Sequence, residues 1–186
     1  MITTKRGNVE GLNVSVRANT GFHVAKAYPE YLGSAEYMTL YNEALLNDDP
    51  TAKPLYTAEQ IYNHGSGLNP YRYPNINYYS SDYVKKAYNR SEVTAEITGG
   101  GKRARFYSNV SYYRNGDFLD FGEAKNNMTD RFNVRGNVDV DINSFISAYI
   151  NANATFYNSK SAKGDYWNAA ATVRPNFPQM QLHLFL

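Results

Sequence analysis

Two segments in the second half of the chain place apolar residues at every second position. In the first segment, residues 131–142, the apolar positions are Phe132, Val134, Gly136, Val138, Val140 and Ile142. In the second segment, residues 146–157, they are Ile146, Ala148, Ile150, Ala152, Ala154 and Phe156. A period of two predicts β-strands whose successive side chains lie on opposite faces of a sheet. Both strands are about twice the usual length of about 5–6 residues.

The length of these strands favours a membrane-spanning sheet over an ordinary core. A tilted strand needs about 9–11 residues to cross the hydrocarbon layer of a bilayer, and both segments reach that length. The apolar side chains are then expected to face lipid. The intervening positions of the first segment are expected to face a lumen: Arg131, Asn133, Arg135, Asn137, Asp139 and Asp141.

Three earlier strands are predicted at about 9–22, 92–98 and 103–113. The connections between the five strands alternate between long and short, as in an outer-membrane barrel with long external loops and short periplasmic turns. The sequence therefore predicts an all-β fold, with antiparallel up-and-down strands that form part of a transmembrane β-barrel.

The two short turns agree with the assignment of faces. A three-residue loop at 143–145 keeps Ile142 and Ile146 on one face, and a four-residue loop at 99–102 keeps Thr98 and Arg103 on the other. A slip of one residue at either turn would put a whole polar face into lipid.

Two short helices are predicted in the long first loop. Ser34 is expected to cap a helix that runs to about Leu46. Thr57 and Gln60 form a capping box that opens a second helix, which is expected to end near Gly65.

Composition narrows the class of protein further. The net charge is +2 and the basic residues are dispersed, so nucleic acid is not an expected partner. The chain has no cysteine, and Met1 to Gly7 lacks the apolar segment of a secretory signal. Because an outer-membrane protein needs such a signal, we expect this chain to be a fragment of a longer one.

The candidate chemistry lies in the loops rather than in a catalytic centre. The 18 tyrosines suit membrane interfaces and wet binding surfaces. Six loop aromatics are candidates for binding substrate, although they could instead pack a small core within the loops: Tyr71, Tyr73, Tyr78, Tyr79, Tyr166 and Trp167. The spacing of the histidines and carboxylates supports no metal site, no cofactor and no catalytic group, so the protein is not expected to be an enzyme.

Several segments resemble one family when taken in order along the chain. Residues 2–7, Ile-Thr-Thr-Lys-Arg-Gly, resemble the last plug strand of TonB-dependent outer-membrane transporters of the SusC/RagA type. Residues 34–44 and 54–61 are similar to two helical motifs of that family, and residues 98–112 are similar to its Gly-Gly hairpin. Residues 74–79 are also similar, except that Asn77 and Tyr78 replace the usual Asp and Trp.

The resemblance implies part of a large importer. Residues 1–8 would end the plug, residues 9–177 would begin a plugged barrel of 22 strands, and residues 178–186 form an atypical tail. The intact transporter would lie in the cell outer membrane, pair with a SusD-like surface lipoprotein and be driven by TonB to import a glycan or peptide.

Two other functions compete with this interpretation. A soluble, secreted β-sandwich that binds carbohydrate would pack the same apolar rows against a second sheet. A β-rich glycoside hydrolase ranks last, because Asp139 and Asp141 continue a polar row instead of forming a distinct acid pair.

Overall fold

The computed structural model describes residues 6–7 and 11–177 of the 186-residue chain. The expected plug strand at 1–8 and the atypical tail at 178–186 therefore lie almost wholly outside the described residues. The described residues divide into two compact units. The first unit contains the strands, and the second contains the α-helices.

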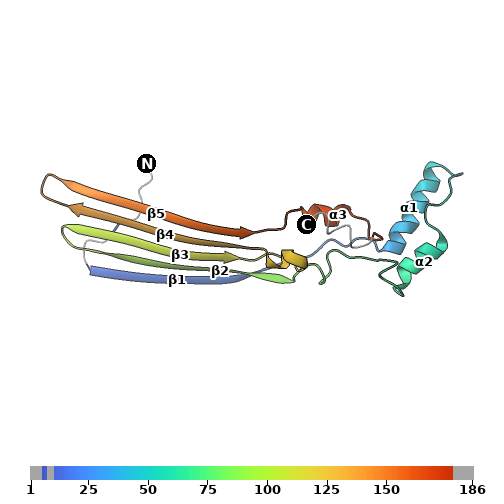
Figure 1. The fold of residues 1–186 in the computed structure, drawn as a ribbon, viewed down its shortest axis with the longest axis horizontal. Coiled ribbons are helices and arrows are strands. Elements are labelled where there is room, and N and C mark those ends of the chain that lie inside the picture. Colours follow the sequence, from blue (N-terminus) through green and yellow to red (C-terminus); the bar gives the residue numbers. More distant parts are fainter. Residues whose placement is uncertain (1–5, 8–10, 178–186) are drawn as a thin grey trace. The chain divides into compact units, whose positions relative to one another are not determined.

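The first unit is a single five-stranded antiparallel sheet in which each strand pairs with its neighbour in sequence (Figure 1). The strands are β1 (Gly11–Val24), β2 (Ala87–Gly100), β3 (Ala104–Asn115), β4 (Met128–Asp141) and β5 (Ser147–Lys160). The sheet is open, with β1 and β5 as its edges. All five predicted strands and their up-and-down order are confirmed. β2 is longer than its prediction, because Ala87 to Ser91 alternate less clearly and still pair with β1.

The β4–β5 turn has the predicted register. Asp141 pairs with Ser147, and the next backbone bond joins the Ile142 amide to the Ile146 carbonyl at 2.9 Å. The side-chain oxygen of Asn143 closes the loop, because it accepts from the backbone amides of Phe145 and Ile146, both at 2.8 Å. The loop of three residues therefore keeps Ile142 and Ile146 on one face.

The β2–β3 turn has the predicted number of loop residues but lies two residues further along the chain. Gly100 pairs with Arg105, which leaves residues 101–104 between the last paired residues. The Gly101 amide donates to the Ala104 carbonyl at 2.7 Å. Because the loop still has four residues, the faces of both strands are unchanged.

The second unit holds three α-helices, and two of them were predicted. Helix α1 (Ser34–Asp48) is capped by Gly33 and not by Ser34, so that prediction was wrong. Ser34 is fully buried, and its hydroxyl donates to the Pro74 carbonyl at 2.9 Å. Helix α2 (Ala58–Ser66) has the predicted capping box, in which Thr57 accepts from the Gln60 amide at 3.2 Å.

Two helical segments were not predicted. Helix α3 (Tyr166–Thr172) and a 3₁₀ turn, η1 (Gly122–Asn126), are both too short to show a helical period in the sequence. None of the helices in the described ranges combines the length and the hydropathy that a membrane-spanning helix requires.

The Asn143 loop gives a test of the turn. Asn143→Ala removes the acceptor of two backbone amides, so we expect it to lower the free energy of unfolding by about 1 kcal/mol. Asn143→Asp keeps an acceptor and should lose less. A urea titration of the chain in detergent measures both variants, and equal losses would contradict this role of the side chain.

Candidate functional site

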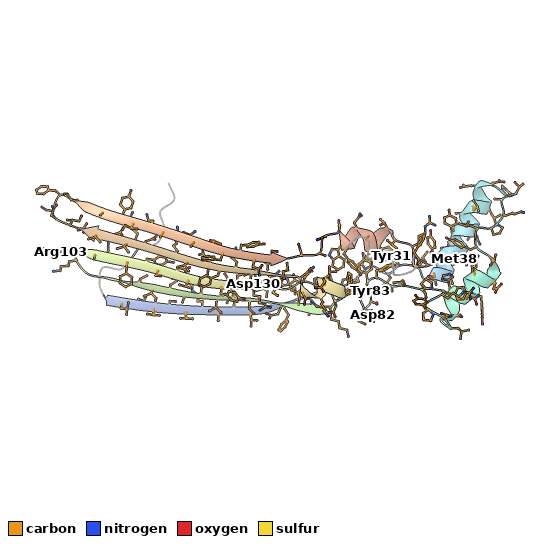
Figure 2. The ribbon with its side chains drawn as sticks, in the orientation of Figure 1. Tyr31, Met38, Asp82, Tyr83, Arg103 and Asp130 are labelled. Carbon is orange, nitrogen blue, oxygen red and sulfur yellow. The ribbon has the colours of Figure 1, made fainter. Side chains whose placement is uncertain are left out.

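The register of the sheet sorts its side chains into an apolar face and a polar face. Side chains of the strands stand on both sides of the sheet in Figure 2. Paired residues point to the same side of an antiparallel sheet. The apolar face carries Leu12, Val14, Val16 and Ala18 of β1; Val93, Ala95 and Ile97 of β2; Ala104, Phe106 and Val110 of β3; alternate residues from Phe132 to Val140 of β4; and Ala148 to Phe156 of β5.

The apolar face is largely exposed. Val138 is 40% exposed, Ile150 is 68% exposed and Val14 is 56% exposed. The described strands form one sheet, so no second sheet covers these side chains within the described residues. A large continuous apolar surface of this kind marks an interaction with protein or membrane.

Near one end of the apolar face the side chains change from apolar to polar on all five strands, although β1 carries the exposed Phe22 and Val24 beyond this change. The last apolar row, read across the five strands by hydrogen-bonded register, is Ala18, Val93, Tyr112, Phe132 and Phe156. The next row on the same face, which we name the polar row, is Thr20, Ser91, Arg114, Asp130 and Asn158. The polar row lies at the end of the sheet where β1 and β3 finish and the long connections leave.

The polar face holds all six residues that were predicted to face a lumen, from Arg131 to Asp141 along β4. It is the better-covered face near the centre of the sheet, where Asn137 is 3% exposed and Tyr107 is 7% exposed. Arg131 stands over the Tyr113 ring at 5.1 Å, and Asn133 accepts from the Thr155 hydroxyl at 2.8 Å. Asp141, at the other end of the row, accepts from the Ser147 hydroxyl at 2.7 Å, so polar contacts between strands occur along this face.

Asp139 joins three segments on this face. Its carboxylate lies 3.4 Å from the Arg6 guanidinium and 3.7 Å from that of Arg105. Gly7 passes so close to the backbone of Phe106 that a Cβ atom would overlap it. A short stretch before β1 thus lies against the polar face. The ion pairs place Asp139 in a polar wall, which gives no support to an acid pair with Asp141.

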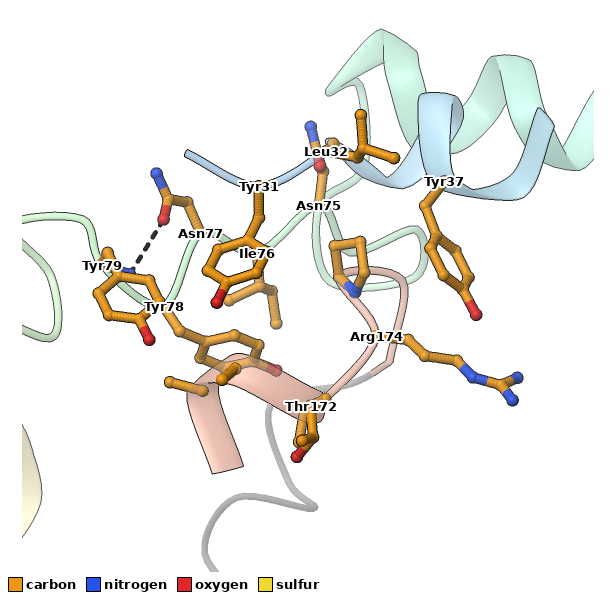
Figure 3. A pocket seen from close by; sticks show the side chains of 15 residues that line it. Tyr31, Leu32, Tyr37, Asn75, Ile76, Asn77, Tyr78, Tyr79, Thr172 and Arg174 are labelled. Atoms are coloured by element: carbon orange, nitrogen blue, oxygen red, sulfur yellow. Dashed lines mark hydrogen bonds between the residues drawn. The ribbon is translucent and has the colours of Figure 1, made fainter. Parts of the chain in front are cut away.

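The second unit contains a cavity of about 450 Å³ beside α3 (Figure 3). It is lined by residues 31–33 and Tyr37 at the start of α1, by residues 75–79, and by residues 170–175, and it is open to solvent. Its aromatic wall includes Tyr31 and Tyr79, whose rings stack with centroids 5.6 Å apart. Among the predicted aromatics, Tyr78 and Tyr79 line this cavity.

The other four predicted aromatics separate into two groups. Trp167 stacks on Tyr79 at 6.0 Å, and the buried Tyr166 donates to the Tyr78 carbonyl at 2.5 Å. These two residues contact lining residues but do not line the cavity themselves. Tyr71 is 87% exposed and Tyr73 packs edge-on against His64, so neither residue lines the cavity.

Sequence reasoning missed several lining residues, above all Tyr31, Tyr37 and Arg174. They lie in irregular segments or at a helix terminus, where no period marks them. Asn75 and Asn77 stood within the motif 74–79, and that was the one available signal. In the described part of the chain, no group of three or more His, Asp or Glu side chains is placed to hold a metal ion.

Tyr78 is the most unusual polar group of the cavity. Its side chain is 4% exposed, and its hydroxyl is buried without a hydrogen-bond partner. Burial, with a smaller contribution from Tyr83, raises the pKa of Tyr78 to about 12. Burial also raises the pKa of Tyr166.

A scan against protein-family models and a search of curated protein sequences both found no match for this chain. The resemblance to SusC-type transporters therefore stays a prediction from the quoted motifs.

The high pKa of Tyr78 predicts how this unit responds to alkali. Because the folded state favours the neutral phenol, this contribution to stability is fully present below about pH 10 and is lost as the pH rises through about 12. Tyr78→Phe should remove one tyrosinate transition near pH 12, measured by ultraviolet absorbance. A transition lost below pH 10 would contradict the buried position of this hydroxyl.

Proposed function

We propose that this chain is part of an outer-membrane, TonB-dependent importer of the SusC type, with transport and not catalysis as its activity. The observation that carries the proposal is the distribution of the two faces: the apolar face is exposed, and the polar face is the better covered near the centre of the sheet. Soluble sheets bury their apolar face against a core. A membrane barrel does the reverse, with apolar side chains outward and a polar interior.

The dimensions of the apolar face support a lipid contact. On β5 and its preceding turn it runs from Ile146 to Phe156. At roughly 3.3 Å per residue this is about 33 Å along the strand, and a strand tilt of about 40° reduces the height to about 25 Å, the usual height of the apolar band of a barrel. Tyr112, Phe132 and Phe156 occupy the last apolar row before the polar row, where barrels place their aromatic girdle.

The polar face supports a hydrated, partly filled interior. Arg6 and Gly7 lie on this face and contact Asp139 and the Phe106 backbone. In the proposed importer these residues end the plug, and the six residues from Arg131 to Asp141 line the wall around it. In this proposal Asp139 is part of the wall and also contacts the end of the plug.

The open edges of the sheet support the view that further strands complete the structure. β1 and β5 are both 14 residues long, and each pairs on one side only within the part of the chain that the structure describes. Unpaired backbone groups are not tolerated in lipid, so the proposed barrel needs more strands to close. The proposed partners of the complete importer are outer-membrane lipid, a SusD-like surface lipoprotein and TonB.

The soluble β-sandwich was the alternative interpretation. It requires a second layer of protein on the apolar face, and Val138 at 40% exposed and Phe156 at 65% exposed lack one. No observation on the described residues favours this alternative over the importer.

Charge placed on the two faces of the sheet separates these functions. Val138→Arg should cost about 2–4 kcal/mol in the parent barrel folded into lipid vesicles, because the arginine would lie near the middle of the bilayer. Asn151→Arg is the matched control, since Asn151 pairs with Asn137 on the polar face, and it should cost less.

The same measurement has an outcome that would overturn the proposal. If Val138→Arg leaves the free energy of unfolding unchanged while Asn137→Leu abolishes folding, the apolar face does not meet lipid and the faces are assigned wrongly.

A further inference from the structure

Two arginines of β4, Arg131 and Arg135, lie on the polar face without a carboxylate partner. Among the described residues, no ion pair includes either guanidinium. The acidic side chains that the strands place on this face each contact another residue: Glu92 contacts Arg90 at 3.9 Å, Glu96 contacts Arg17 at 3.8 Å, Asp139 contacts Arg105 at 3.7 Å and Asp141 contacts Ser147 at 2.7 Å. The described part of the chain therefore leaves the charges of Arg131 and Arg135 without a counter-charge.

The neighbours of these two arginines on the polar face are neutral and polar. Asn133 stands between them on β4, because alternate residues of a strand share a face. The residues that pair with these three positions on β3 and β5 carry hydroxyl or amide groups: Asn109, Ser111, Tyr113, Asn153, Thr155 and Tyr157. We name this set of residues, together with Arg131, Asn133 and Arg135, the arginine patch. It contains no aspartate and no glutamate.

The arginine patch is open to a solute. Arg131 is exposed and Arg135 is half-buried. The Arg131 guanidinium lies 5.1 Å from the centre of the Tyr113 ring, so it leans toward β3. Tyr157, which pairs with Arg131 on the other side, is 65% exposed. The patch therefore offers a cation and, beside it, an aromatic ring that the described residues leave largely uncovered.

The chemistry of the arginine patch fits an extended solute with several carboxylates. The planar guanidinium of arginine presents its donors in a fork that matches a carboxylate. Arg131 and Arg135 are four residues apart, which is about 13 Å along a strand at roughly 3.3 Å per residue. A solute with a carboxylate on successive units can contact both side chains. Pore walls that carry arginine in this way favour anions.

We propose that the arginine patch binds an oligomer that carries a carboxylate on each unit. Arg131 and Arg135 pair with two of its carboxylates, and the exposed Tyr157 ring packs against one of its units. This inference rests on the proposed importer for its biological role, in which it makes the imported substrate acidic. An acidic saccharide and an acidic peptide share this chemistry, and the test distinguishes them.

The test is calorimetric titration of the purified chain in a nonionic detergent at an ionic strength of about 0.01 M, where charges act over about 30 Å. The acidic probes are a galacturonic acid trimer and a glutamate tripeptide. The neutral probes are a galactose trimer and a glutamine tripeptide with blocked ends. We expect an acidic probe to bind, neither neutral probe to bind, and the affinity to fall as salt is raised. Preference for one acidic probe identifies the source of the carboxylates.

Neutral variants locate the binding site on the polar face. Arg131→Gln and Arg135→Gln should each weaken binding by about tenfold, the change that corresponds to about 1.4 kcal/mol. Arg114→Gln is the matched control, because it removes the same charge from the opposite face. The Arg114 side chain is 54% exposed and belongs to the polar row beyond the apolar face. This control should bind as the parent chain does.

An added carboxylate tests the same patch without removing an arginine. Asn133→Asp keeps the oxygen that accepts from the Thr155 hydroxyl and places a negative charge between Arg131 and Arg135. It should weaken binding by about tenfold or more, because the new carboxylate competes with the solute. Asn158→Asp is the matched control, since Asn158 lies in the polar row on the opposite face, and it should leave binding unchanged.

Three outcomes would overturn this inference. They are equal affinity for the neutral and acidic probes, no binding of either acidic probe by a chain whose circular dichroism is intact, and equal losses from Arg114→Gln and Arg131→Gln. None of them bears on the energetic cost of Val138→Arg in lipid. The failure of this inference is therefore distinguishable from the failure of the importer proposal.

Discussion

The strict alternation of side chains between the two faces, kept in register across five paired strands, is the constraint on which the sheet depends. In an antiparallel sheet, paired residues share a face, so one face stays apolar only if every turn preserves the alternation. Both short turns do so: residues 143–145 place Ile142 opposite Ile146, and residues 101–104 place Gly100 opposite Arg105. A single inserted residue at either turn would exchange the faces of every strand that follows.

Because this alternation separates polar from apolar side chains, the two faces of the sheet make different contacts. On the polar face, long side chains reach across strands, and Asp139 lies between Arg6 and Arg105. The arginines of these ion pairs are partly exposed, so the pairs contribute little to stability. They mark where the stretch before β1 meets β4. On the apolar face, Phe132 and Phe156 pack at 6.2 Å and remain exposed. Stability on that face depends on what surrounds the sheet, which in the proposed importer is lipid.

Sequence predicted the elements that have a period or a local signature. The five strands followed from alternation, and α2 followed from its Thr57–Gln60 capping box. The start of α1 was assigned to Ser34 on capping preference, but tertiary contacts with Pro74 and Asn75 bury this residue inside the first turn. Helix α3 is too short to show a period. The cavity was only partly predicted, because Tyr31, Tyr78 and Arg174 come to line one cavity through the fold and not through spacing in the chain.

The most direct test of the central claim is a scan of solvent and lipid accessibility along β4. The chain has no cysteine, so single cysteines from Arg131 to Val140 can each carry one nitroxide spin label in lipid vesicles. The account predicts high collision rates with oxygen at Phe132, Val134, Gly136, Val138 and Val140, and low rates at the intervening residues, with a period of two. Oxygen accessibility that peaks instead at Arg131, Asn133, Arg135, Asn137 and Asp139, or that shows no period, would contradict a sheet that turns its apolar face to lipid.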